Sequence, residues 1–196
     1  MLKNICVYGA SSASIDHVYL DAANALGKAI AEQGYGMVFG AGDTGVMGAA
    51  ARGAHDAGGK VIGVLPRFMA EVEGLAYPDC DELVVAETMR ERKKALEELS
   101  SAYITAPGGI GTFEEFFEIL TLKQLHQHGK ALVVLNTQDY YRPLLNLLNE
   151  CVNQQFAAPS MHSLYGVADT PAEALAYIEA YRYVEPQGPW HEGRST

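Results

Sequence analysis

The residues with the clearest chemical potential lie in the segment 107–115, which reads PGGIGTFEE. Its three glycines let the backbone turn sharply and approach a ligand without steric conflict from a Cβ atom. An apolar run precedes the segment and an amphipathic stretch follows it, which predicts a strand, a tight turn and a helix. Unpaired N–H groups and the positive dipole end of such a helix favour a phosphate. The pattern therefore predicts a phosphate cradle beside two acids, Glu114 and Glu115.

A purely structural interpretation of these acids is also open. Thr112 and Glu115 have the spacing of a capping box, in which two side chains satisfy the first N–H groups of a helix. Short motifs of this kind also occur by chance. From spacing alone, Glu115 is either a catalytic carboxylate or a helix cap.

A cluster of positive charge, RERKK at residues 90–94, opens another predicted helix. Such a run usually forms a solvated face. This one follows a strand, at the same end of the sheet as the glycine turn, and puts cations where the helix dipole disfavours them. Arginine also offers a planar fork of donors suited to a phosphate or a ribose. The cluster is therefore a candidate part of the same site.

A second glycine turn, GAGDTG at residues 40–45, matches G-x-G-x-x-G after a predicted strand. A dinucleotide site also needs an acid about 20 residues further on. No acid lies between Ala57 and Ala70, so we expect no NAD site. The turn is better explained as a second backbone wall for a smaller ligand, or simply as close packing of a strand on a helix.

Composition excludes several other classes of protein. The net charge of −10 argues against a nucleic-acid binder. The three cysteines are far apart and odd in number, which indicates a reducing cytoplasm, and Cys6 lies in an apolar run that predicts a core position. No signal peptide or membrane-length apolar run is visible. His126 and His128 would face different directions, so we expect no metal site.

Short apolar strands alternate with helices along the chain, which predicts an α/β fold: a doubly wound, mostly parallel sheet in a Rossmann-like three-layer α/β/α arrangement. We expect one domain over residues 1–183, a poorly ordered tail at 184–196 and a mobile loop over the site at 67–81. The predicted strands are 5–9, 36–39, 61–65, 83–85, 102–106, 131–135 and 164–167, and the predicted helices are 16–33, an alanine-rich helix ending at Gly58, 88–98, 113–125, 140–154 and 171–181.

Three loops of small residues, 10–14, 40–48 and 107–112, each follow a strand, so they can converge where such sheets bind ligands. On the helix that follows the last loop, we expect a buried stripe with Glu115 near its edge, partly desolvated but able to reach a ligand. The stripe is formed by Phe113, Phe116, Phe117 and Leu120.

Met89-x-x-Arg92-Lys93, followed by the PGGxGTxxE block of 107–115, resembles the LOG ("Lonely guy") family of cytokinin riboside 5′-monophosphate phosphoribohydrolases, often labelled lysine decarboxylases. The similarity covers most of the chain. Residues 7–12 resemble the family's first strand and Gly-Ser-Ser loop, and 40–48 resemble its second glycine turn, with Ala41 in place of a glycine.

The resemblance implies a homodimer without metal or organic cofactor. It implies hydrolysis of the N-glycosidic bond of AMP, or of an N6-modified adenosine monophosphate, to the free base and ribose 5-phosphate. Arg92 and Glu115 match the family's catalytic pair. The residues that match its substrate contacts are Ser12, Gly42, Met89, Lys93, Gly108, Gly109, Ile110, Gly111, Thr112, Glu114 and Thr121.

The residue types suit this chemistry, because glycosidic cleavage passes through an oxocarbenium-like state that a carboxylate stabilises. Glu115 would stabilise the ribosyl cation or position water, and Arg92 would orient the ribose and phosphate. A non-catalytic nucleotide or molybdenum-cofactor carrier is the alternative, since it needs the cradle without this pair. Pyridoxal-phosphate decarboxylation is disfavoured, because no lysine stands in a suitable setting. The preferred base is left open.

Overall fold

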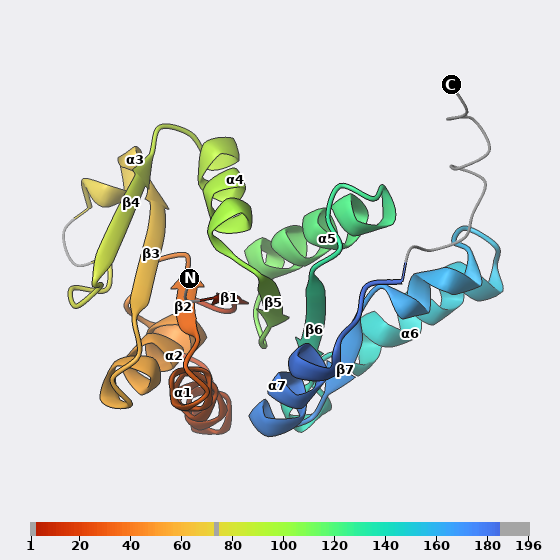
Figure 1. The fold of residues 1–196 in the computed structure, drawn as a ribbon, viewed down its shortest axis with the longest axis horizontal. Helices are drawn as coiled ribbons and strands as arrows, with labels where there is room; N and C mark the ends of the chain where they lie inside the picture. The colour runs from red at the N-terminus through yellow and green to blue at the C-terminus, as the bar shows by residue number, and fades with distance from the viewer. Residues whose placement is uncertain (1–2, 73–74, 185–196) are drawn as a thin grey trace.

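The computed structural model describes residues 3–72 and 75–184, and its centre is one parallel sheet of seven strands (Figure 1). The strands lie in the order β4-β3-β2-β1-β5-β6-β7, and every pairing is parallel. The strands are β1 (Asn4–Tyr8), β2 (Gly36–Phe39), β3 (Val61–Pro66), β4 (Glu82–Ala86), β5 (Ala102–Thr105), β6 (Ala131–Leu135) and β7 (Gly166–Ala168).

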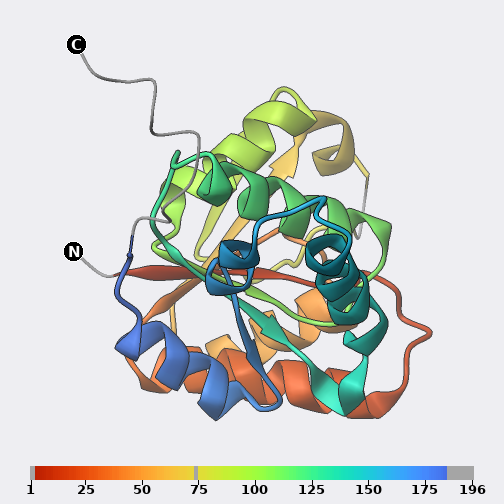
Figure 2. The same ribbon diagram turned by 90° about the vertical axis from the view of Figure 1, so that its right-hand side faces the viewer.

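Helices cover both faces of the sheet, as the two orthogonal views show (Figures 1 and 2). Helices α1, α2 and α7 pack on one face, and α4, α5 and α6 pack on the other. This confirms the predicted three-layer α/β/α fold. The helices are α1 (His17–Glu32), α2 (Gly45–Asp56), α3 (Arg67–Ala70), α4 (Met89–Leu99), α5 (Ile110–Gln124), α6 (Arg142–Asn153) and α7 (Pro171–Ala180), with short 3₁₀ segments η1 (Thr137–Asp139) and η2 (Pro159–Ser163). No helix among the described residues is long and apolar enough to cross a membrane.

Strand β1 shows why the strands are continuous apolar runs in the sequence. Ile5 and Val7 point into the core under α1 and α2, while Cys6 and Tyr8 point into the core under α4 and α5. A strand buried on both faces has no polar side to alternate with. Cys6 is fully buried, and burial raises the pKa of its thiol to about 12, so its predicted core position is confirmed.

The direction in which strands are added reverses at β1, which pairs with β2 on one side and with β5 on the other. The loops that follow these three strands therefore leave the same edge of the sheet side by side. Such a switch point is where open parallel sheets bind ligands. The amide of Ala10 donates a hydrogen bond to the carbonyl of Pro107 (3.1 Å), which joins two of the three loops directly.

The structure contains one of the two capping boxes considered from the sequence, the one at α4. At α4 the capping box is confirmed, because Thr88 accepts from the amide of Glu91 and Glu91 accepts from that of Thr88. At α5 the predicted capping box is wrong. This helix starts at Ile110, three residues earlier than expected, so Glu115 lies too far into the helix to cap it.

The predicted core stripe of α5 needs one correction. Phe116 and Leu120 are buried, but Phe117 is 37% exposed. Lys123 is buried instead, and its ammonium lies 4.4 Å from the centre of the Tyr181 ring. The inward face of α5 therefore extends as far as Lys123, which meets the ring of Tyr181 at the C-terminal end of α7.

The segment predicted as a loop over the site, 67–81, begins with α3 and is then attached to the second glycine turn. The amide of Tyr77 donates to the carbonyl of Ala41 (2.8 Å), and Gly42 forms an antiparallel bridge with Ala76. Of the predicted tail, Val184 is described and exposed, and the remainder lies outside the described residues.

Helices α1 and α2 approach so closely that two glycines are required between them. A Cβ atom on Gly27 would lie 1.8 Å from the carbonyl oxygen of Ala50, and one on Gly53 would lie 2.0 Å from that of Asn24. We expect Gly27→Ala to lower the free energy of unfolding by about 1–3 kcal/mol, through overpacking. The measurement is urea denaturation followed by circular dichroism.

Helix propensity alone predicts the opposite sign for Gly27→Ala, a gain of about 0.5–1 kcal/mol. The exposed neighbour Ala25 provides the control, since Ala25→Gly should lose about 1 kcal/mol by propensity only. A Gly27→Ala protein more stable than the parent would contradict the close approach.

His128 makes the stability of the fold depend on pH. Its buried ring donates from Nε2 to the carbonyl of Ile119 (2.9 Å) and accepts at Nδ1 from the amide of Lys130 (3.2 Å), which requires a neutral imidazole. Burial lowers its pKa from 6.5 to about 4. The unfolded chain therefore takes up this proton first, and we expect stability to fall from about pH 6.5 toward pH 4 by on the order of 3 kcal/mol.

Urea denaturation at a series of pH values measures this loss. His128→Gln should flatten the curve in that window, because glutamine can donate and accept without titrating. The exposed His162 gives the matched control, His162→Gln. An unchanged slope in the His128 variant would show that other groups cause the loss.

Candidate functional site

The turn after β5 presents backbone donors to an open space. In the part of the chain that the structure describes, no N–H group of residues 109–112 donates a hydrogen bond to the protein. A Cβ atom on Gly109 or Gly111 would meet nothing within 4 Å, so these glycines leave room for a ligand. These free donors lie at the start of α5, where the sequence predicts an anion cradle.

Arg92 and Glu115 face each other across the space between α4 and α5. Nη1 of Arg92 lies 3.0 Å from Oε1 of Glu115, and Arg92 is only 7% exposed. Its Nε donates to the carbonyl of Val64 at the end of β3 (3.1 Å). A Cβ atom on Gly40 would lie 2.2 Å from Nη2, so the glycine turn after β2 makes room for the guanidinium.

The environment of Glu115 perturbs its protonation. Burial raises the pKa of the carboxyl, Arg92 opposes this through its charge and hydrogen bond, and the result is a pKa above the ordinary value. A buried carboxylate interacts strongly with charge that develops nearby, because little water screens it. Glu115 is therefore placed to respond to a cation forming in the adjacent cavity.

A cavity of about 400 Å³ lies in front of the cradle and contains both members of the pair, a size in the usual range for small-ligand sites. A smaller cavity of about 170 Å³ adjoins it and shares Ser11, Met47, Met69 and Arg92. The larger cavity is lined by Gly9, Ala10, Ser11, Ser12, Met47, Met69, Met89, Arg92, Gly109, Ile110, Gly111, Thr112, Glu114 and Glu115.

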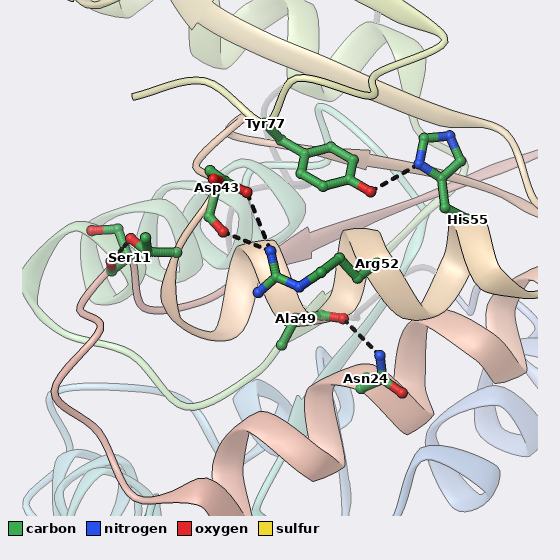
Figure 3. Close-up of polar contacts among 8 residues, drawn as sticks. Ser11, Asn24, Asp43, Ala49, Arg52, His55 and Tyr77 are labelled. Atoms are coloured by element: carbon green, nitrogen blue, oxygen red, sulfur yellow. Dashed lines mark hydrogen bonds and ion pairs between the residues drawn. The ribbon is translucent and has the colours of Figure 1, made fainter. Parts of the chain in front are cut away.

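The second glycine turn forms a wall of this space and is braced from outside. Ala41 has a φ of 62°, the left-handed conformation that favours glycine, although the residue here is an alanine. Figure 3 shows Arg52 reaching back along α2 to Asp43, and the hydroxyl of Tyr77 meeting Nδ1 of His55 at 2.9 Å. These contacts hold the turn and the segment above it together.

Most of the predicted contact residues lie at these cavities. The larger cavity is lined by Ser12, Met89, Gly109, Ile110, Gly111, Thr112 and Glu114, as well as by the Arg92–Glu115 pair, and the smaller one is lined by Gly42.

Three predicted residues line neither cavity. Lys93 is paired with Glu114 (2.5 Å) and Glu118 (3.1 Å), so its ammonium links α4 to α5. Gly108 shapes the turn, because a Cβ atom there would lie 2.1 Å from Oγ1 of Thr112. Thr121 lies exposed on α5, near the end of the helix.

Five residues that line the larger cavity were not among the predicted contact residues. Gly9, Ala10 and Ser11 precede Ser12 in the same small-residue loop, and that adjacency could have identified them. Met47 lies within the second glycine turn as predicted, 40–48, and inside the first turn of α2. Met69 lies in the segment 67–81, which the sequence analysis placed over the site without naming the residue that reaches it.

Comparison with known proteins adds to this geometry. A family model described as "Possible lysine decarboxylase" matches residues 47–178. A cytokinin riboside 5′-monophosphate phosphoribohydrolase from Rhodococcoides fascians is 36% identical over 178 residues, which cover 91% of this chain and 90% of that protein. The corresponding enzyme LOG5 of Arabidopsis thaliana is 34% identical, over 93% of this chain and 79% of its own length.

Solved structures include a second kind of relative. A molybdenum cofactor carrier protein from Chlamydomonas reinhardtii superposes with a TM-score of 0.69 at 28% identity, over 91% of this chain and 97% of that one. A molybdenum cofactor binding protein from Rippkaea orientalis, at 22% identity and a TM-score of 0.68 over 92% of this chain and 98% of that one, shows the shared fold. From the family model and the phosphoribohydrolase relatives, the chain belongs to the LOG family, whose model carries the description of possible lysine decarboxylases.

Proposed function

We propose that the protein hydrolyses the N-glycosidic bond of a nucleoside 5′-monophosphate, giving the free base and ribose 5-phosphate. The observation that carries the proposal is the buried Arg92–Glu115 pair, which lines the same cavity as the free N–H groups of the cradle. The cradle would bind the phosphate of the substrate, and the desolvated carboxylate beside it would stabilise the charge that develops during the reaction. The names of the relatives point to the same class of reaction.

The 5′-phosphate is assigned to the cradle. The chain carries a net charge of −10, so an anion must be attracted by local groups. The N–H groups of 109–112 and the positive end of α5 supply these at short range. With the phosphate there, the ribose extends into the cavity toward Glu115.

The reaction needs charge stabilisation at C1′. The bond from C1′ to the base nitrogen breaks with its electron pair on the base, and a water oxygen bonds to C1′. One proton of that water is lost to solvent and the base takes up one proton, so that the products are the neutral free base and ribose 5-phosphate. The ionised carboxylate of Glu115 stabilises the positive charge on the ribosyl ring and orients that water. Arg92 holds Glu115 in place, and its charge favours the ionised form against the effect of burial.

The base is assigned to the methionine-rich side of the cavity. Met47, Met69 and Met89 line it, and the smaller cavity behind them is also lined by Leu65 and Leu75. Methionine side chains adapt to irregular apolar shapes, which suits a purine with an apolar N6 substituent. An adenosine monophosphate with or without such a group is therefore the proposed substrate class.

A non-catalytic carrier is the second candidate, because the Chlamydomonas protein shares the fold at 28% identity. A carrier has no need of a buried carboxylate beside the ligand. The two candidates are separated by incubating the protein with AMP, isopentenyl-adenosine monophosphate and the matching ribosides, and measuring free base by chromatography. Release from the monophosphates supports the enzyme, and tight binding without release supports the carrier.

Replacement of Glu115 tests the catalytic assignment. We expect Glu115→Gln to reduce kcat for base release by about 10²–10³-fold, the usual effect of removing one group that stabilises developing charge. Glu98→Gln, on the exposed face of α4, is the matched control and should retain parental turnover. Parental rates of base release in Glu115→Gln would rule out this role.

The acid limb of the pH profile tests the same carboxyl. Turnover requires ionised Glu115, whose pKa is raised, so kcat should fall as the pH drops through a value above the ordinary 4.5. Arg92→Gln removes the charge that favours the ionised form, so the limb should move to higher pH in the residual activity. The measurement is kcat against pH for both proteins, and an unmoved limb would assign it to another group.

A further inference from the structure

The cradle has a second side, formed by the carbonyl groups of residues 106–109. Two tyrosine hydroxyls donate to this side from the chain between β6 and α6. Tyr140 donates to the carbonyl of Gly108 at 2.6 Å, and Tyr141 donates to that of Ala106 at 2.8 Å. Neither tyrosine lines the cavity, so both act on the turn from behind.

Backbone amides satisfy the other two carbonyls of the turn. The amide of Ala10 donates to Pro107 at 3.1 Å, and that of Phe113 donates to Gly109 at 3.0 Å. Every carbonyl of the turn is therefore held by the protein, while no N–H group of 109–112 is. An anion site requires this arrangement, in which the carbonyl oxygens are bound by the protein and the N–H groups are left free for the ligand.

The contact of Tyr140 has a directional consequence. The peptide that joins Gly108 to Gly109 is trans, so its C=O and N–H groups point in opposite directions. Fixing the carbonyl of Gly108 against Tyr140 therefore turns the N–H of Gly109 toward the cavity. The contact of Tyr141 cannot orient a donor in this way, because the next residue is Pro107, which has no N–H.

The chain before Tyr140 adopts an unusual conformation to place this hydroxyl. Gln138 and Asp139 have φ values of 54° and 58°, which residues other than glycine rarely adopt. Asn136 supports them, since its Nδ2 donates to Asp139 (3.1 Å) and its Oδ1 accepts from the amide of Tyr141 (2.7 Å). Consecutive strained residues persist where the surrounding structure requires them.

We propose that Tyr140 is a positioning residue for phosphate recognition, one that aims the N–H of Gly109 at the phosphate of the substrate. The inference rests on the proposed function, because it assigns the phosphate to the cradle. The ring of Tyr140 packs edge-on against the rings of Tyr19 and Tyr141, with distances between ring centres of 5.8 Å and 5.0 Å. Tyr140→Phe therefore removes the hydroxyl and keeps the packing.

The experiment measures the affinity for ribose 5-phosphate by isothermal titration calorimetry in the parent, Tyr140→Phe and Tyr177→Phe. Tyr177 is a matched control, a half-buried tyrosine of α7 that packs over Gly166. We expect Tyr140→Phe to bind about 3–10-fold more weakly, the usual effect of one hydrogen bond, and Tyr177→Phe to bind as the parent does. With AMP, KM should rise by the same factor while kcat stays within about twofold, because the phosphate contact is shared by ground and transition states.

The outcomes separate this inference from the proposed function. Equal affinity of the parent and Tyr140→Phe for ribose 5-phosphate would overturn the role of Tyr140 and leave the function standing. A fall in kcat with unchanged KM would also overturn it, since the hydroxyl would then act on the reaction rather than on phosphate binding. If the parent itself does not bind ribose 5-phosphate, both the cradle assignment and the role of Tyr140 fail.

Discussion

The burial of an ion pair between α4 and α5 is the constraint on which the site depends. Taking two charges out of water is costly unless their geometry and remaining hydrogen bonds are satisfied. Arg92 meets this condition through Glu115, the carbonyl of Val64 and the space left by Gly40. Two helices, the end of β3 and the turn after β2 are therefore tied to one guanidinium.

The sheet supplies the second half of the site by bringing three loops to one edge. The reversal at β1 places the cradle beside the small-residue loop that ends at Ser12, and the amide of Ala10 links the two. In this acidic chain, the positive groups at the turn are backbone dipoles and not a net positive charge. Most donors of the cradle are main-chain groups, so the position of the backbone matters more there than the identity of the side chains.

Local patterns were enough to predict the sheet and the glycine turn after β5, because apolar runs and glycine turns are properties of neighbouring residues. The Arg92–Glu115 pair was expected from the resemblance to the LOG family, and the two side chains lie 3.0 Å apart. The errors lie where distant contacts decide. Glu115 is a partner of Arg92 and not a helix cap, since α5 starts at Ile110. The buried ammonium of Lys123 lies against Tyr181, nearly 60 residues away.

The space at Gly40 has a consequence for how the Arg92–Glu115 contact could be lost in evolution. The volume that a side chain would fill there is already occupied by the guanidinium of Arg92, more than 50 residues further along the chain. A side chain at position 40 would therefore force the guanidinium to shift, although no charged residue had been replaced. The persistence of the buried ion pair thus depends on a residue that has no side chain of its own.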